Sequence, residues 1–255
     1  MSVLVTGGLG FIGIHLVTAL KQLGYEVDII DLKTDSDITE PLPRKDYEII
    51  YHLAAKKSVS SSELYPAKFI HNNIYGTLNL AKAYPDARFI NISSSSVNDV
   101  KSVYGFTKLC AETALEAFHD NYLNVRLYNV FGEGQHASSG ALIPSLLRYK
   151  RIGQPPVIYG DGEQKRDFTY VGDVVQNLIN ISNMPFSGVY HLGYGSSISV
   201  NEIIELIYGK MPLIDYRPSR QFDIVDSCSQ TKMKEFHGRI AGLQRTIDWF
   251  EKESN

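Results

Sequence analysis

The sequence predicts an α/β protein built on a doubly wound parallel sheet, with a smaller lobe formed mainly by its C-terminal part. Three observations lead to this prediction. Short apolar runs alternate with helix-like segments through the first two-thirds of the chain. A glycine string directly follows the first apolar run, and after Phe131 the composition changes to Gly-, Ser- and Pro-rich segments. Alternating strands and helices are typical of parallel sheets with helices on both faces.

The first half of the chain supplies the elements of the sheet in order. The expected strands cover residues 3–6, 27–30, 49–53, 88–92 and 124–128, and the expected helices cover residues 11–23, 67–84 and 107–118. The first helix has apolar residues at helical spacing and ends at Gly24, as expected where a glycine follows a helix C-terminus. In such a sheet, ligands bind at the carboxyl ends of the strands.

The second half of the chain differs from the first in composition. Residues 132–140 and 154–162 have the composition of loops and turns. The elements expected around and after them are a helix at 173–181, a strand at 188–192, a helix at 200–207 and an amphipathic stretch that runs through Trp249. We interpret these segments as a smaller lobe that closes over a ligand.

Composition and charge exclude several classes of protein. The 255 residues are 44% hydrophobic and 21% charged, as in ordinary globular proteins. A net charge of −3 gives no basic footprint for nucleic acid. The first residues do not read as a signal peptide, and no apolar run reaches the roughly 20 residues of a membrane span. The two cysteines, Cys110 and Cys228, indicate no disulfide framework, so we expect a reducing cytoplasm.

The glycine string places Gly7, Gly10 and Gly13 between the first strand and the first helix. Glycine allows positive φ and lets the backbone approach a pyrophosphate closely. The N-terminus of the following helix offers unpaired N–H groups and the positive end of its dipole. The string predicts a phosphate cradle, and a plain glycine-rich turn is the alternative.

Asp31 ends the second strand, 18 residues beyond Gly13. A carboxylate at this point accepts hydrogen bonds from ribose hydroxyls and repels a 2′-phosphate, which favours NAD over NADP. The nearby Lys33 weakens that preference. The alternative is an aspartate that serves only the turn at the strand end.

Tyr104 and Lys108 stand four residues apart, so both lie on one face of a helix. A free tyrosine has a pKa near 10, but a neighbouring ammonium favours the phenolate and makes the pair a general acid/base. Ser94, at the end of the fourth strand, could hydrogen-bond the same substrate oxygen. The Tyr–Lys spacing alone is weak evidence for a catalytic pair. It becomes informative because the pair begins the helix after the fourth strand of a chain that also has a predicted phosphate-binding turn.

Seven strings, in order, resemble the extended short-chain dehydrogenase/reductases, and in particular their NAD-dependent epimerase/dehydratase branch. They are TGGLGFIG (6–13), YHLAA (51–55), NNIYGTLNL (72–80), ISSSSV (92–97), YGFTK (104–108), RLYNVFGEGQ (126–135) and YGDGEQKRDFTYVGDVV (159–175). The resemblance implies a Rossmann-type NAD-binding domain from residues 1–131 and about 170–195. It also implies a substrate-binding lobe from about 132–169 and 196–255, and a homodimer formed through the helices at 67–84 and 107–118.

The resemblance also assigns residues to roles. Those implied to hold NAD are Gly7, Gly10, Phe11, Ile12, Gly13, Asp31, Asp37, Ile38, Leu53, Ala54, Ala55, Lys57, Asn72, Tyr104 and Lys108. Those implied to be catalytic are Ser94, Tyr104 and Lys108, and a slip of one residue would replace Ser94 by Ser93 or Ser95. Those implied to contact a UDP- or dTDP-sugar are Ser94, Ser95, Asn129, Arg166 and Arg217, with Arg220 as a weaker candidate.

Structural alternatives remain for several of these side chains. His52 is more typical of a packed strand-end histidine than of a catalyst. Lys57 could be a solvated surface charge, and Asn129 could cap a loop. Arg166 could form an ion pair with a neighbouring aspartate. The histidines show no metal-ligand spacing, so no metal is expected.

Two segments are shorter than the family pattern. Only six steps separate Asp31 from Asp37, where the family has a helix and a strand, so we expect the sheet to lack an edge strand. Nine residues lie between Ser94 and Tyr104, which shortens a loop that encloses the sugar. Ser95 and Ser96 replace the acidic pair of the 4,6-dehydratases, and serine cannot do that acid–base work.

These features favour a nucleotide-sugar 4-epimerase that forms a transient 4-keto sugar. A 4-ketoreductase, dehydrogenase or dehydratase is the first alternative. A regulatory NAD-binding protein without catalysis is the second.

Overall fold

The computed structural model describes residues 1–219 and 224–253. The chain divides into two compact units, which we describe separately. The first comprises residues 1–127 and 175–191, and the second comprises residues 128–174 and 192–255. The arginine candidate Arg220 lies outside the described residues.

The first unit is organised around a six-stranded sheet with strand order β10-β5-β4-β3-β1-β2. Its strands are β1 (Ser2–Thr6), β2 (Glu26–Ile30), β3 (Ile49–His52), β4 (Arg88–Ser94), β5 (Tyr122–Leu127) and β10 (Gly188–Leu192). The pairs β1–β2, β1–β3, β3–β4 and β4–β5 are parallel. The doubly wound parallel sheet predicted from the sequence is therefore confirmed.

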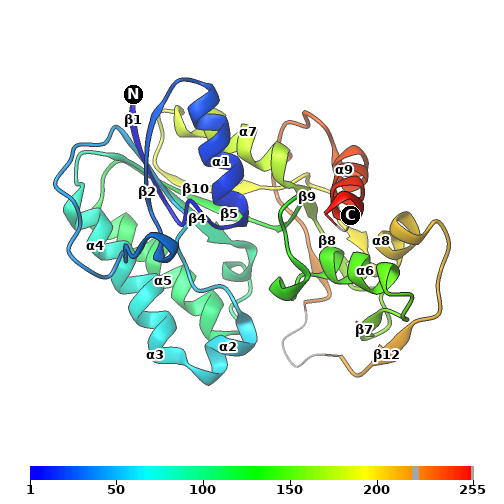
Figure 1. The fold of residues 1–255 in the computed structure, drawn as a ribbon. Coiled ribbons are helices and arrows are strands. Elements are labelled where there is room, and N and C mark those ends of the chain that lie inside the picture. The colour runs from blue at the N-terminus through cyan, green and yellow to red at the C-terminus, as the bar shows by residue number, and fades with distance from the viewer. Residues whose placement is uncertain (220–223, 254–255) are drawn as a thin grey trace. The chain divides into compact units, whose positions relative to one another are not determined.

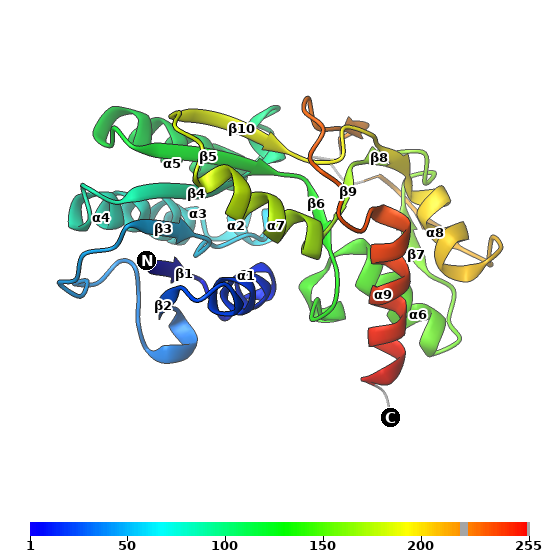
Figure 2. The ribbon, with the colours of Figure 1, turned by 90° about the horizontal axis from the view of Figure 1, so that it is seen from above.

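Helices cover both faces of this sheet. The helices of this unit are α1 (Phe11–Gln22), α2 (Val59–Leu64), α3 (Pro66–Phe69), α4 (Gly76–Ala83), α5 (Val103–Phe118) and most of α7 (Val171–Ser182), with 3₁₀ turns at Leu32–Thr34 and Ser95–Val97. Figures 1 and 2 show α1 on one face, with α4 and α5 on the other. The single helix expected at 67–84 is interrupted by a π-helical segment, Ile70–Tyr75, between α3 and α4.

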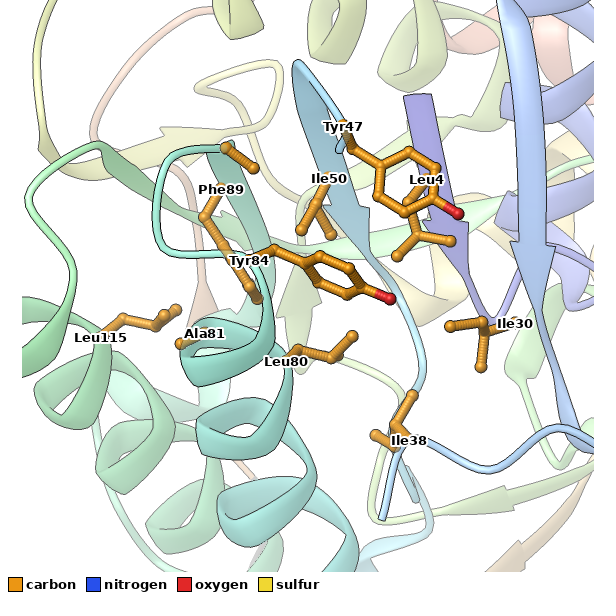
Figure 3. Close-up of a cluster of buried hydrophobic side chains, with 11 residues drawn as sticks. Leu4, Ile30, Ile38, Tyr47, Ile50, Leu80, Ala81, Tyr84, Phe89 and Leu115 are labelled. Atoms are coloured by element: carbon orange, nitrogen blue, oxygen red, sulfur yellow. The ribbon is translucent and has the colours of Figure 1, made fainter. Parts of the chain in front are cut away.

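The sheet ends at β2, as the short segment after Asp31 predicted. In place of a crossover helix, residues 35–48 form an irregular coil after the 3₁₀ turn. Ile38 and Tyr47 from this coil pack with Leu4, Leu80 and other buried side chains (Figure 3). The coil therefore fills the place of a missing helix on that face of the sheet.

The second unit contains smaller sheets and three helices of its own within the described residues. The strands are β6 (Asn129–Phe131), β7 (Val157–Tyr159), β8 (Lys165–Arg166), β9 (Phe168–Tyr170), β11 (Ile198–Ser199), β12 (Asp215–Arg217) and β13 (Asp226–Ser227). The helices are α6 (Leu142–Arg151), α8 (Val200–Tyr208) and α9 (Arg239–Lys252), with a 3₁₀ turn at Ala137–Ser139. Strand β7 lies within the segment expected to be only loop, because its pairing with β12 is a long-range contact.

Asp167 anchors the second unit from its interior. Its carboxylate is fully buried and accepts hydrogen bonds from the backbone N–H groups of Tyr194 and Gly195, at 3.2 and 2.9 Å. Arg239 adds an ion pair at 3.3 Å. Burial raises the pKa of Asp167, and these hydrogen bonds oppose that shift.

Candidate active site

The turn between β1 and α1 requires glycine at two positions. Gly7 has φ +68°, and a Cβ added there would lie 2.8 Å from the Ala54 backbone nitrogen. A Cβ added at Gly13 would lie 2.2 Å from the Gly7 carbonyl oxygen. Gly10 caps α1 without any side-chain hydrogen bond, so backbone N–H groups of the first turn remain available to an anion.

A cavity of about 360 Å³ opens beside this turn, within the first unit. Its lining includes every residue expected to hold the cofactor except Tyr104 and Lys108, namely Gly7, Gly10, Phe11, Ile12, Gly13, Asp31, Asp37, Ile38, Leu53, Ala54, Ala55, Lys57 and Asn72. The lining residues that sequence reasoning missed are Ile30, Leu32, Ser36, Lys56 and Ile92. Most of these adjoin predicted residues in sequence, which was the available signal.

Asp31 is fixed at the wall of this cavity by hydrogen bonds to both carboxylate oxygens. Oδ2 accepts from the backbone N–H of Leu9 at 3.0 Å, and Oδ1 accepts from that of Lys33 at 3.0 Å. The Lys33 ammonium donates to the Leu9 carbonyl oxygen at 2.7 Å. Each carboxylate oxygen retains a lone pair for a ribose hydroxyl. The uncapped helix, the glycine turn and this carboxylate together fit a dinucleotide.

Ser94, Tyr104 and Lys108 lie on two adjoining elements of the same unit. Ser94 ends β4, where its hydroxyl donates to that of Ser96 at 3.1 Å, and Tyr104 lies in the first turn of α5. Lys108 follows one turn later and is 3% exposed. Burial raises the pKa of Tyr104, and the hydrogen bond to Ser94 opposes this shift. Burial lowers the pKa of Lys108 to about 8, while the charge of Glu112 opposes that shift.

The neighbouring serines have different partners. The Ser93 hydroxyl donates to the Glu112 carboxylate, so it is turned to another part of α5. Ser95 begins the 3₁₀ turn that follows β4. Of the three serines considered from the sequence, Ser94 is the one whose side chain lowers the pKa of Tyr104.

The start of α5 is held by side chains that sequence reasoning did not single out. Ser102 caps the helix by accepting from the Gly105 backbone at 3.1 Å. Ser62, from α2, accepts from the backbone N–H of Tyr104 at 3.0 Å, and Glu63 accepts from that of Val103 at 2.8 Å. The four serines among residues 58–62 were a signal for the start of α2, since serine is a preferred N-cap residue.

His52 is a structural histidine, as its strand-end position suggested. It is 1% exposed and hydrogen-bonds the Thr6 and Thr77 hydroxyls at 2.7 and 3.0 Å. Burial lowers its pKa to about 3, so it is neutral at physiological pH. Asn72 accepts from the Lys56 backbone N–H at 3.1 Å, which fixes the loop after β3 beside the cavity.

The sugar-contacting candidates of the second unit lie on its short strands. Asn129 begins β6 and donates its backbone N–H to the Asp167 carbonyl at 3.0 Å. Arg166 lies on β8 and donates to the Lys165 carbonyl oxygen at 2.7 Å. Arg217 lies on β12, is half exposed and pairs with Asp215 at 2.9 Å.

Among the residues that the structure describes, no helix is long and apolar enough to cross a membrane. No group of three or more His, Cys, Asp or Glu side chains among them is arranged to hold a metal ion. Cys110 and Cys228 are both free thiols.

Fold and site together define a dinucleotide-binding α/β protein with the serine, tyrosine and lysine of a short-chain dehydrogenase/reductase. A family model described as "NAD dependent epimerase/dehydratase family" matches residues 3–193, and the chain belongs to that family. Its relatives are NAD-dependent nucleotide-sugar epimerases, decarboxylases and dehydratases. The family resemblance seen in the sequence is confirmed, and with it the dependence of the family on NAD.

Among curated relatives, a putative UDP-glucose 4-epimerase of Methanocaldococcus jannaschii is 29% identical, covering 80% of this chain and 81% of that protein. The UDP-glucuronic acid decarboxylase 4 of Arabidopsis thaliana is 28% identical over 88% of this chain, which spans 61% of that protein's length.

Among solved structures, a UDP-N-acetylglucosamine 4-epimerase of Methanobrevibacter ruminantium is 30% identical, with a TM-score of 0.88 over 99% of this chain and 98% of that one. The UDP-glucose 4-epimerase of Thermotoga maritima is 27% identical, with a TM-score of 0.89 over the full length of both chains.

Proposed function

We propose that this chain is an NAD-dependent nucleotide-sugar 4-epimerase acting on a UDP- or dTDP-sugar. The observation that carries the proposal is the arrangement of Ser94, Tyr104 and Lys108 in the unit that holds the dinucleotide cavity. NAD, when bound, supplies reversible oxidation of the sugar carbon that bears the C4 hydroxyl. The residues of the chain then have to bind the sugar and move one proton.

Tyr104 is the proposed proton carrier. Its phenolate takes the proton of the C4 hydroxyl as that carbon is oxidised, and its phenol returns a proton when the 4-keto sugar is reduced on the opposite face. Ser94 orients the sugar oxygen by hydrogen bonding. Burial raises the pKa of Tyr104. The Lys108 ammonium, one helical turn away, is proposed to favour the phenolate, because a nearby positive charge stabilises it.

The other assignments are part of the same proposal. Ser95, Asn129, Arg166 and Arg217 are proposed to contact the nucleotide sugar, the arginines through its diphosphate, whose oxygens suit the guanidinium fork. The first unit is the proposed NAD-binding domain, and the second is the proposed substrate-binding lobe. We also propose a homodimer and, from the two free thiols, a cytoplasmic setting.

The test is incubation of the purified chain and NAD with a panel of UDP- and dTDP-sugars, followed by NMR and mass spectrometry. A 4-epimer of unchanged mass is expected, with the cofactor retained through gel filtration. A product that has lost carbon dioxide would instead establish decarboxylation, the activity named for several relatives. Release of reduced or oxidised cofactor in each cycle would establish a ketoreductase or dehydrogenase.

Tyr104→Phe is the decisive variant. It should lower turnover by a factor of about 10² to 10⁴, the usual contribution of general acid–base catalysis, while NAD binding measured by calorimetry is retained. Tyr65→Phe is the matched control. Tyr65 is 56% exposed, so this variant should retain full activity. Full activity in Tyr104→Phe would refute the mechanism. An intact chain that binds NAD but converts no nucleotide sugar would favour the regulatory alternative.

A further inference from the structure

A buried carboxylate lies one helical turn beyond Lys108 on α5. Glu112 is 3% exposed, and Tyr104, Lys108 and Glu112 follow one another at intervals of four residues, so they line one side of the helix. The roles proposed for Ser94, Tyr104 and Lys108 leave Glu112 unused. A buried charge of this kind is retained only where its partners offset the cost of desolvation.

Arg126, from β5, is the main partner of Glu112. Its Nη2 lies 2.6 Å from Oε2, and its Nε lies 3.0 Å from Oε1, so the guanidinium holds the carboxylate through two nitrogens. The same guanidinium donates from Nη1 to the Asn98 side-chain oxygen at 3.0 Å. Asn98 belongs to the short loop between Ser94 and Tyr104, so the arginine fixes that loop as well.

Ser93 is the second partner, and it connects Glu112 to the reacting groups. Its hydroxyl donates to Glu112 Oε1. Because Ser93 immediately precedes Ser94, this contact ties the end of β4 to the helix that bears Tyr104 and Lys108. The carboxylate therefore joins α5, β4 and β5 at one point.

Charge gives Glu112 a second effect. Its carboxylate favours the protonated form of Lys108, against the desolvation that lowers the pKa of this lysine to about 8. His191, in β10, is a further titratable group near this pair: burial and Arg126 lower its pKa, and Glu112 opposes that shift. On the side of Lys108, the buried His52 is neutral, because burial and the lysine charge lower its pKa to about 3.

We propose that Glu112, held by Arg126, is a positioning residue for the reaction: through Ser93 it fixes Ser94 relative to Tyr104. This inference rests on the proposed function, since it assigns the three residues their catalytic roles. A purely structural ion pair would affect stability alone. A positioning residue changes kcat in a chain that is fully folded.

Glu112→Gln tests the role of the charge, because glutamine keeps the size and one acceptor oxygen. We expect kcat to fall by about 10-fold or more at pH 7 with KM nearly unchanged, since the lost interaction serves the transition state and not substrate binding. The rising limb of the pH–rate profile should move to higher pH, because a less protonated Lys108 stabilises the phenolate less. Glu116→Gln is the matched control, one turn further on and exposed, and it should change neither quantity.

A readout independent of turnover is the titration of Lys108, followed by NMR of isotope-labelled lysine side chains and assigned with Lys108→Met. In Glu112→Gln, Lys108 should lose its proton at lower pH than in the unchanged chain. Glu112→Asp keeps the charge with a shorter reach, so it should leave the Lys108 titration close to normal while kcat still falls.

An unchanged kcat in folded Glu112→Gln would overturn the positioning role. An unchanged titration of Lys108 would overturn the role of the charge. If the unchanged chain converts no nucleotide sugar, the proposed function fails, whereas the titration still tests the effect of Glu112 on Lys108. The two failures are therefore distinguishable.

Discussion

Replacing Lys108 with methionine should stabilise the cofactor-free chain while abolishing turnover. Burial lowers the pKa of Lys108 from 10.5 to about 8. Since one pKa unit corresponds to about 1.4 kcal/mol, the protonated lysine costs the folded chain about 3 kcal/mol. Methionine has a similar length and no charge, so it removes this cost. A stabilising substitution that destroys activity is the pattern expected where a side chain is retained for chemistry.

The stabilisation of Lys108→Met relative to the unchanged chain should decrease as the pH rises. Below pH 8 the lysine is protonated in both the folded and unfolded states, so the penalty is fully present, and it disappears as the pH rises toward 10.5. Urea unfolding should show Lys108→Met more stable by about 3 kcal/mol at pH 7 and by only about 1 kcal/mol at pH 10, apart from a constant packing contribution.

Lys101→Met is the control for this prediction, because Lys101 is exposed and pairs with Asp99 at 2.6 Å. The difference in the free energy of unfolding between Lys101→Met and the unchanged chain should stay nearly constant over the same pH range. A difference between Lys108→Met and the unchanged chain that does not vary with pH, or that grows as the pH rises, would refute the reasoning.

Three further substitutions test the cavity and the sheet. Gly13→Ala should weaken NAD binding by more than about 10-fold in calorimetry, since its Cβ would lie 2.2 Å from the Gly7 carbonyl oxygen. Gly153→Ala is the control, because no atom lies within 4 Å of the added Cβ, and it should retain NAD binding. Equal affinities of the two variants for NAD would contradict this account. Asp31→Ala should weaken NAD binding and reduce the preference for NAD over NADP by about 10-fold; an unchanged ratio of the two affinities would contradict the proposed role of the carboxylate. Arg88→Met should destabilise the chain by about 2–4 kcal/mol in urea unfolding, because its buried guanidinium donates to four backbone carbonyls and to an asparagine side chain. A loss below about 1 kcal/mol would contradict the importance of these contacts.

Much of the first unit could be predicted from the sequence because its determinants are local. The apolar runs of β1 to β5 and the glycines after β1 specify strand, turn and helix in order, and the missing edge strand could be predicted from length alone. The short strands of the second unit could not, because β7, for example, is three residues long and is defined by its pairing with β12. Two- and three-residue strands have no periodicity to detect.

The candidate site shows the same division. Tyr104 and Lys108 could be found from their spacing, and Ser94 from its place at a strand end. The Glu112–Arg126 pair could not be predicted, because it joins residues on a helix and on a separate strand. Likewise, Ser62 contacts the start of α5 from a helix far earlier in the chain.

The coil at residues 35–48 makes few hydrogen bonds of its own. The Asn79 amide donates to the Ile38 and Glu40 carbonyls at 2.8 and 2.9 Å, and the Tyr84 hydroxyl donates to the Pro43 carbonyl at 2.9 Å. Side chains of one neighbouring segment thus replace the internal ladder that a helix would have. This layer should therefore open locally long before the sheet unfolds, and its amides should exchange with solvent early. Because Ile38 also lines the dinucleotide cavity, a bound dinucleotide would close the layer and slow that exchange.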